Sequence, residues 1–152
     1  MTRIRNAVFR RGLRAMSVLH RLVYRTTGGR IGGTALDLSI LLLTTTGRKT
    51  GRPRTRPLCF LPDGDTLVVV ASNGGKDWFP DWWLNLVADP HATVEVGRDR
   101  RPVVARRATP DEHARLWPAL TAVAPGYLRY RARTEREIPL VLLERPEGAS
   151  PL

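Results

Sequence analysis

The residues whose types and spacing best suit a chemical role lie between positions 44 and 56, where basic residues are mixed with threonines and glycines. Five residues of this segment are lysine or arginine, and no acidic residue occurs in residues 38–62. Glycine lets a backbone approach an anion closely, while threonine and arginine donate hydrogen bonds to phosphate oxygens. The segment is not a Walker phosphate-binding loop, because Arg48 rather than glycine precedes Lys49. A solvated basic turn is the alternative, but such a turn normally includes acidic residues, so the pattern favours a site for a phosphate or a polycarboxylate.

A second candidate segment combines a glycine pair with two adjacent tryptophans. Gly74 and Gly75 follow an apolar stretch, and Trp82 and Trp83 come shortly after them. A glycine pair after a strand allows a flat ring to lie against the backbone, whose N–H and C=O groups can then bind the edge of the ring. Tryptophans belong to a core more often than to a site. We therefore predict that one tryptophan packs in the core and that the other lines a pocket.

The remaining reactive residues predict little chemistry. Cys59 is the only cysteine, which excludes an internal disulfide, and no histidine lies near it in the sequence. We interpret it as a buried packing residue rather than a nucleophile. His20, His91 and His113 are not spaced like metal ligands, so no metal site is predicted.

Short apolar strands separated by turn residues must position these segments. Apolar and β-branched stretches predict strands over residues 38–45, 54–61, 66–72, 92–96, 103–108 and 138–143. Turn residues predict two hairpins, with turns at 62–65 and 97–100, and helices are predicted over 81–88 and from the capping residue Thr109 to about 124. Six mostly antiparallel strands with few helices favour a small barrel over a doubly wound sheet.

Residues 3–25 predict a basic amphipathic helix. At about 100° per residue, arginines at positions 3, 10, 14, 21 and 25 share one arc of the helix, beside an arc of apolar residues. Such a helix lies on an anionic membrane surface or packs its apolar stripe on the protein's own core, and the sequence leaves both open. The chain is thereby divided into a helix over 1–30, a barrel domain over 31–145 and a loose tail over 146–152.

Length and charge place the chain among single-domain soluble proteins. It has 152 residues, of which 42% are hydrophobic, and no apolar run approaches the roughly 20 residues that span a membrane. Without a secretory signal, the expected location is the cytoplasm, with possible peripheral contact with the membrane. The net charge is +11, and residues 1–30 hold eight arginines and no acidic residue. This favours an anionic partner near the first third of the chain, although an arginine-preferring genome explains part of the excess.

Four motifs in register resemble the deazaflavin-dependent nitroreductase family of actinobacteria, which uses coenzyme F420 on a split β-barrel. They are the Thr-Thr-Gly-Arg-Lys-Thr-Gly-x-Pro-Arg turn at 45–54, the Ala-Ser-x-Gly-Gly strand end at 71–75, the Trp-x-x-Asn-Leu helix at 82–86 and the Thr-x-Arg-x-Ile-Pro segment at 134–139. The resemblance covers about residues 32–144. It implies an α+β, mainly β fold, a six-stranded split β-barrel with an N-terminal helix and two further short helices. A basic N-terminal helix also recurs in members of that family that work near the membrane.

The resemblance implies an F420-dependent oxidoreductase that passes hydride from the reduced deazaflavin to a quinone or nitroaromatic acceptor. The grip on the cofactor's phosphate and oligoglutamate tail falls on Arg48, Lys49, Thr50 and Arg54. The next strand lines the cofactor with Thr55, Arg56, Pro57, Leu58 and Cys59. Ring contacts fall on Val70, Ala71, Ser72, Asn73, Asp81, Trp82, Trp83, Leu84 and Asn85. Tyr127 and Tyr130 match tyrosines that close over the substrate, where they orient or protonate the acceptor, and Tyr127 also touches the cofactor.

Two positions depart from the nitroimidazole-active members of that family. Cys59 and Ala124 stand where aromatic residues are expected, so the implied pocket is roomier and nitroimidazole activation is in doubt. A non-catalytic barrel protein that holds a lipid, a quinone or a cofactor is a second hypothesis, which the intact cationic segment disfavours. A nucleic-acid-binding module is a third, motivated by a pI near 11.4. No helix-turn-helix or aromatic RNA-binding signature supports it, so no nucleic-acid partner is expected.

Overall fold

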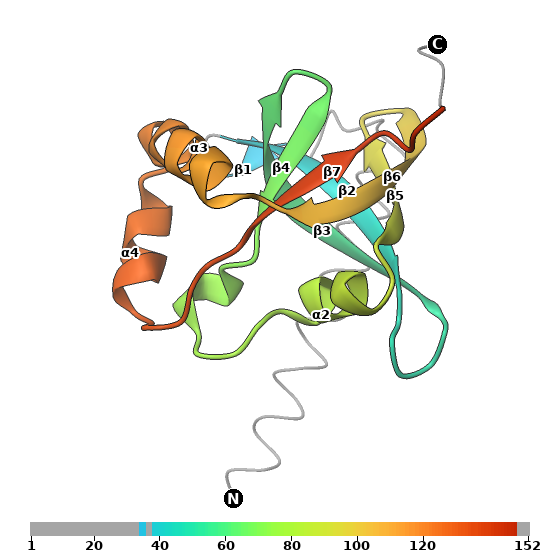
Figure 1. Ribbon diagram of the computed structural model, residues 1–152, viewed down its shortest axis with the longest axis horizontal. Helices are drawn as coiled ribbons and strands as arrows, with labels where there is room; N and C mark the ends of the chain where they lie inside the picture. The colour runs from blue at the N-terminus through green and yellow to red at the C-terminus, as the bar shows by residue number, and fades with distance from the viewer. Residues whose placement is uncertain (1–33, 36–37, 149–152) are drawn as a thin grey trace, which may run out of the picture.

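The computed structural model of the protein describes residues 34–35 and 38–148 (Figure 1). The predicted helix over residues 3–25 lies outside the described residues. So do the last four residues of the predicted tail.

Six antiparallel strands close into a barrel, which confirms the predicted fold class. The strand order is β2-β3-β4-β7-β6-β5, and β5 pairs back with β2 to complete the ring, while the short β1 pairs with β2 only. All pairs are antiparallel. The bounds are β1 Thr34–Ala35, β2 Leu38–Thr46, β3 Pro53–Asp63, β4 Thr66–Val70, β5 His91–Val96, β6 Asp99–Arg107 and β7 Leu140–Glu144.

Alternating apolar residues of the strands fill the barrel interior. Leu41 and Leu43 of β2 are fully buried there, and Val69 of β4 and Val141 of β7 belong to the same cluster. Helix α2 (Asp81–Ala88) adds Trp82 and Leu86 to this cluster, so it closes one end of the barrel, as Figure 1 shows. The 3₁₀ helix η1 (Asn73–Gly75) lies between β4 and α2 in the chain.

A second apolar layer covers the outside of β4 and β7. The outward residues of these strands pack against α3 (Pro110–Val123) and α4 (Gly126–Ala132). Thr109 caps α3 as predicted, since its hydroxyl accepts from the Glu112 N–H while the Glu112 carboxylate accepts from the Thr109 N–H. Arg106 binds both Glu112 and Glu144 and thereby ties α3 to β7.

The structure differs from the prediction in several elements. Strand β1 was not predicted, and β7 begins at Leu140 rather than 138. Helix α4 was not predicted from its seven residues, which begin with glycine. Strand β6 begins at Asp99 rather than 103, because Gly97 has a φ of 60° and allows a tighter turn than the predicted four residues. Strand β4 ends at Val70, and the chain then turns into η1.

Candidate functional site

A cleft of about 600 Å³ opens at the end of the barrel that α2 closes. This volume falls within the usual range for small-molecule sites, roughly 300–1,000 Å³. Its walls come from β3, the end of β4, the segment from η1 to α2, and α4. The lining residues are Arg56, Pro57, Leu58, Cys59, Val70, Ser72, Asn73, Gly74, Lys76, Trp78, Phe79, Pro80, Asp81, Trp82 and Tyr127.

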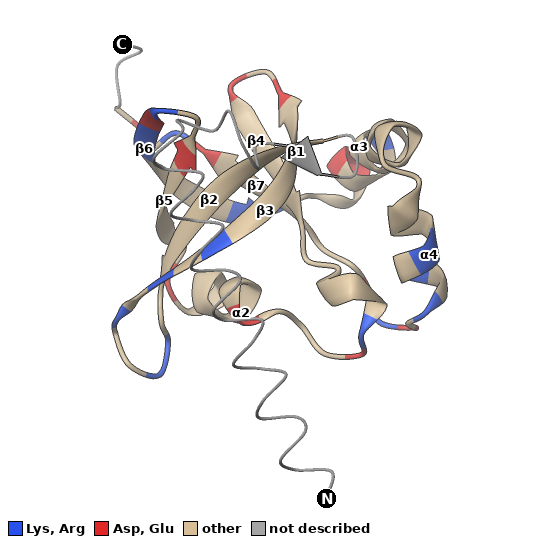
Figure 2. Cartoon of the chain, turned by 180° about the vertical axis from the view of Figure 1, so that it is seen from behind, with Lys and Arg blue, Asp and Glu red and all other residues tan. Residues whose placement is uncertain are grey.

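The turn between β2 and β3, residues 47–52, projects beyond the barrel with its basic residues at the tip (Figure 2). We call residues 47–54 the cationic turn. The Gly51 N–H donates to the Gly47 carbonyl at 2.7 Å, and the Gly47 N–H donates to the Arg52 carbonyl at 2.8 Å. Gly51 needs its glycine for a φ of 68°. Among the described residues, no carboxylate pairs with Lys49, Arg52 or Arg54.

Arg48 differs from the other cations of the turn because its guanidinium already binds side chains of helix α2. Its guanidinium donates to the Asp81 carboxylate at 3.1 Å and to the Asn85 Oδ1 at 3.0 Å. Asn85 is 4% exposed, and its amide N–H₂ donates to the Thr45 hydroxyl at 3.1 Å. Arg48 and Asn85 therefore fasten α2 to the cationic turn and to β2.

Strand β3 carries the predicted lining residues along one side of the cleft. The Thr55 hydroxyl lies 2.8 Å from that of Thr44, which links β3 to β2 behind the cleft. Arg56 is exposed at the cleft edge and has no carboxylate partner among the described residues. Burial raises the pKa of the Cys59 thiol, so the thiol stays protonated at neutral pH. This supports packing rather than nucleophilic attack.

Arg136 holds the loop that follows β4 in place. Its guanidinium donates to the carbonyls of Ser72 and Lys76 at 2.7 Å each and to that of Ala71 at 3.2 Å. It also lies 4.7 Å from the ring centroid of Phe79. Arg136 belongs to the fourth motif of the resemblance, which by itself predicts no role for this residue. Only the fold brings the segment before β7 against this loop.

The two residues of the glycine pair have different surroundings. A Cβ on Gly75 would lie 2.6 Å from the Tyr130 carbonyl oxygen, so Gly75 permits η1 to pack directly on α4. Gly74 has open space around its Cα and lines the cleft. Asn73 precedes them with a φ of 48°, a region that side chains other than glycine and asparagine seldom adopt.

The two tyrosines of α4 lie edge to face, with their ring centroids 5.7 Å apart. Tyr127 is 5% exposed and lines the cleft, whereas Tyr130 is half-buried. The hydroxyl of Tyr127 has no hydrogen-bond partner among the described residues. Burial, with smaller effects of Cys59 and Tyr130, raises the pKa of Tyr127 above its ordinary value. Tyr127 therefore carries its proton throughout the neutral range.

The predicted site residues divide into two groups. Those that line the cleft are Arg56, Pro57, Leu58, Cys59, Val70, Ser72, Asn73, Asp81, Trp82 and Tyr127. Those that do not line it are Arg48, Lys49, Thr50, Arg54, Thr55, Ala71, Trp83, Leu84, Asn85 and Tyr130. Trp82 is both a core residue and a cleft residue, while Trp83 packs partly buried against the core. The cleft is also lined by Lys76, Trp78 and Phe79, which no sequence pattern predicted.

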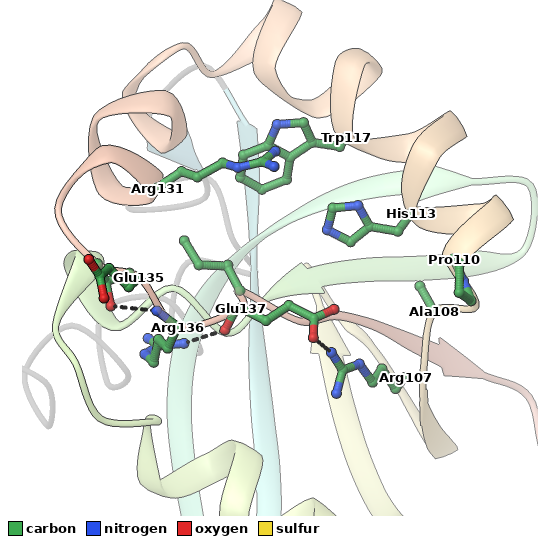
Figure 3. Close-up of a pocket in the computed structure, with 11 residues that line it drawn as sticks. Arg107, Ala108, Pro110, His113, Trp117, Arg131, Glu135, Arg136 and Glu137 are labelled. Carbon is green, nitrogen blue, oxygen red and sulfur yellow. Dashed lines mark hydrogen bonds and ion pairs between the residues drawn. The ribbon is translucent and has the colours of Figure 1, made fainter.

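A second cavity of about 850 Å³ lies between α3, α4 and the segment before β7 (Figure 3). In it His113 stacks on Trp117 with 5.6 Å between centroids, and the Arg131 guanidinium lies 5.3 Å from the Trp117 ring. Arg107 and Glu137 form an ion pair at its edge. Groups of both signs line this cavity, so its chemistry does not select one class of ligand.

The first cleft has the properties that a flat ligand with an anionic tail requires. Arg56 and the neighbouring cationic turn offer positive charges that no carboxylate of the described residues neutralises. Among the described residues that line the cleft, Asp81 is the only one with a carboxylate, and Arg48 already pairs with it. Tyr127 presents a protonated hydroxyl without a partner. Among the described residues, no cluster of histidine, cysteine, aspartate or glutamate could hold a metal ion.

A closed antiparallel barrel with a cationic turn beside such a cleft defines a cofactor-binding barrel protein. The family model described as F420H(2)-dependent quinone reductase matches residues 17–145, and the chain belongs to this family. Membership confirms the sequence-based prediction of an F420-dependent oxidoreductase of the quinone reductase type, and it implies coenzyme F420 as the cofactor.

Individual relatives agree with this assignment. An F420H(2)-dependent quinone reductase of Mycobacterium tuberculosis (strain ATCC 25618 / H37Rv) is 43% identical over 131 residues, which are 84% of this chain and 88% of the relative. A solved F420-H2 dependent reductase, FDR-A, is 34% identical with a TM-score of 0.64, over 69% of this chain and 93% of its own. A chain solved as a domain-swapped dimer is 29% identical with a TM-score of 0.67, over 91% of this chain and 98% of its own.

Proposed function

We propose that this protein binds F420H₂ in the cleft and reduces a quinone that enters from the α4 side. The observation that carries the proposal is the lining of the cleft, which combines Arg56 and Lys76, without carboxylate partners among the described residues, with the unpartnered hydroxyl of Tyr127. When bound, the reduced deazaflavin supplies the hydride. The chain's own residues bind and orient the cofactor and the acceptor, and they exclude water from the cleft.

The tail of the cofactor is assigned to the cationic turn. A phosphate and several glutamate carboxylates offer more than one negative charge, and Lys49, Arg52 and Arg54 are exposed and without carboxylate partners among the described residues. Thr50 accepts a hydrogen bond from Arg54 at 3.4 Å, which keeps that guanidinium at the turn. Arg48 acts here by holding α2, because its hydrogen bonds already go to Asp81 and Asn85.

The flat ring is assigned to the middle of the cleft. Pro57, Leu58 and Val70 offer apolar surface from β3 and β4, and Trp82 closes the far side. The loop that Arg136 holds places Ser72 and Asn73 at the edge of this space. A fixed loop keeps the ring in one orientation, which is the chief contribution of a protein to cofactor chemistry.

Tyr127 is assigned to the acceptor. A quinone that receives hydride also needs a proton on an oxygen, and Tyr127 holds a proton whose loss burial disfavours. A group with a raised pKa donates a hydrogen bond throughout the neutral range. Tyr127 therefore orients the acceptor oxygen, and Tyr130 supports its ring from the edge.

The membrane is the proposed source of the quinone. The arginine stripe predicted over residues 3–25 would bind anionic headgroups, and its apolar stripe would enter the headgroup boundary. Among the described residues, no helix is long and apolar enough to cross a membrane. Nitroaromatic compounds remain a further acceptor class that the resemblance implies.

Binding selectivity tests the assignment directly. The protein is expected to bind F420 more tightly than flavin mononucleotide, because the flavin lacks the glutamate tail that the cationic turn would hold. Titration of each ligand against the intrinsic tryptophan fluorescence measures both affinities. Equal or tighter binding of flavin mononucleotide would contradict the proposal.

Turnover separates an enzyme from a binding protein. Steady-state oxidation of F420H₂ with menadione is expected to proceed in the presence of the protein and to saturate with the quinone. A protein that binds F420 but turns over no quinone would support the non-catalytic alternative.

A further inference from the structure

Trp78 is an exposed tryptophan at the mouth of the cleft. Its side chain is 63% exposed, whereas Trp82 and Trp117 are 7% and 8% exposed. Tryptophan gains more from burial than other residues, so an indole held in solvent beside a cleft calls for an explanation. Its position is defined, because the Asn73 amide donates to the Trp78 carbonyl at 3.0 Å and the Lys76 ammonium lies 5.3 Å from the ring centroid.

Trp78 and Tyr127 line the same cleft. Trp78 belongs to the segment that leads away from η1, and η1 packs on α4 through Gly75. The cationic turn contacts the helix that follows this segment, α2, through the hydrogen bond from Arg48 to Asp81. In Figure 1, α4 and the cationic turn lie on opposite sides of α2. The lining of the cleft therefore includes both Trp78 and Tyr127, whereas Lys49, Arg52 and Arg54, which are assigned to the cofactor tail, are not part of it.

We propose that Trp78 is a specificity-determining residue whose exposed indole stacks on the flat ring of the quinone acceptor. The proposal rests on the proposed function, which assigns the acceptor to the Tyr127 side. An indole carries negative charge density on its face, and a quinone ring is poor in electrons, so the two faces attract each other. Binding would also remove the indole from water. Lys76, on the same loop, steadies the indole through its cation–π contact.

Stacking predicts a dependence on ring size. Menadione has two fused rings and covers more of the indole than 1,4-benzoquinone, so Trp78 should matter more for menadione. Trp78→Ala is expected to raise the KM for menadione by about three- to tenfold, with a smaller rise for benzoquinone. Trp78→Phe should recover most of the loss, and kcat should change by less than about twofold in both variants.

The experiment compares these variants with Val87→Ala in steady-state assays of F420H₂ oxidation. Val87 is also 63% exposed but lies on α2 outside the cleft lining, so its variant controls for the loss of an exposed apolar side chain. Calorimetry should give the same Kd for F420 in all four proteins. Menadione binding, followed by fluorescence quenching, should weaken in Trp78→Ala in parallel with the KM.

Two results would overturn the inference. The first is an unchanged KM for menadione in Trp78→Ala, and reduced binding to anionic vesicles in the same variant would then make Trp78 a membrane contact. The second is a loss of F420 affinity instead, which would place the indole on the cofactor side. If the unsubstituted protein turned over no quinone, the proposed function would fail. Equal menadione affinity of that protein and Trp78→Ala would then overturn the inference separately.

Discussion

At the scale of single residues, the site separates cations used by the fold from cations left for a ligand. Arg48 and Arg136 are surrounded by acceptors of the chain itself. Lys49 and Arg54 are exposed, and no carboxylate of the described residues pairs with them. Because a charged group with an internal partner has little left to offer an anion, the second pair is the better candidate for the cofactor tail.

Lys49→Ala and Arg54→Ala are each expected to weaken F420 binding by about tenfold or more, since a charge-assisted contact contributes roughly 1–3 kcal/mol before screening by salt. An F420 analogue without the phosphate and glutamates should lose much less affinity. Arg98→Ala provides a control with the same charge change, because Arg98 is exposed in the β5–β6 turn away from the cleft. Calorimetric titration with both ligands measures the effects. Equal losses for the two ligands would mean that the turn is structural.

At the scale of elements, the cleft depends on contacts between segments that lie far apart in the sequence. The segment before β7 holds the loop after β4 through Arg136, and the Thr134 hydroxyl donates to Asp77 in the same loop at 2.9 Å. Helix η1 in turn packs on α4. The position of Tyr127 relative to Asn73 therefore follows from two packing contacts rather than from either element alone.

Gly75→Ala is expected to destabilise the protein clearly more than Gly74→Ala. Both glycines have positive φ, so both substitutions carry a backbone cost of about 1 kcal/mol. Only at Gly75 would the new Cβ meet backbone, at 2.6 Å from the Tyr130 oxygen, which forces η1 and α4 apart. Chemical unfolding measures the difference in the free energy of unfolding. Similar losses for the two variants would show that η1 shifts away from α4 at little cost.

At the scale of the whole molecule, the net charge of +11 is distributed unevenly. Figure 2 shows basic residues on the cationic turn and on α4, at two sides of the described barrel. Residues 1–30 add eight arginines without an acidic residue. Attraction to an anionic surface grows with the number of basic residues near it and falls with ionic strength.

Replacing Arg3, Arg10 and Arg14 by glutamine is expected to reduce co-sedimentation with anionic vesicles at low salt. Each basic residue near an anionic surface contributes roughly 1 kcal/mol, so three substitutions should lower the vesicle affinity by about a hundredfold. Oxidation of F420H₂ with menadione in the absence of vesicles should remain unchanged, which controls for the fold. If the unsubstituted protein also stays in the supernatant, the predicted membrane contact is wrong.

The sequence by itself determined the barrel strands, both hairpins and the cationic turn. These follow from local patterns, namely the apolar run of residues 38–45, the turn residues 62–65 and a basic stretch without acids. Such patterns depend on residues that are close together in the chain, so they can be recognised without knowledge of the tertiary structure. Helix α4 was not predicted, because it is short, begins with a glycine and depends on packing against η1 and the outer apolar layer.

Only the tertiary structure decided which of these residues are available for chemistry. It paired Arg48 with Asp81 and Asn85, gave Arg136 to three carbonyls of the loop after β4, and left Trp78 exposed beside the cleft. It also set Gly75 against the backbone of Tyr130 in α4. The physical reason is that pairing and burial depend on which distant segments meet. The pairing of β5 with β2 and the packing of α4 bring those distant segments into contact, and no local sequence pattern predicts these contacts.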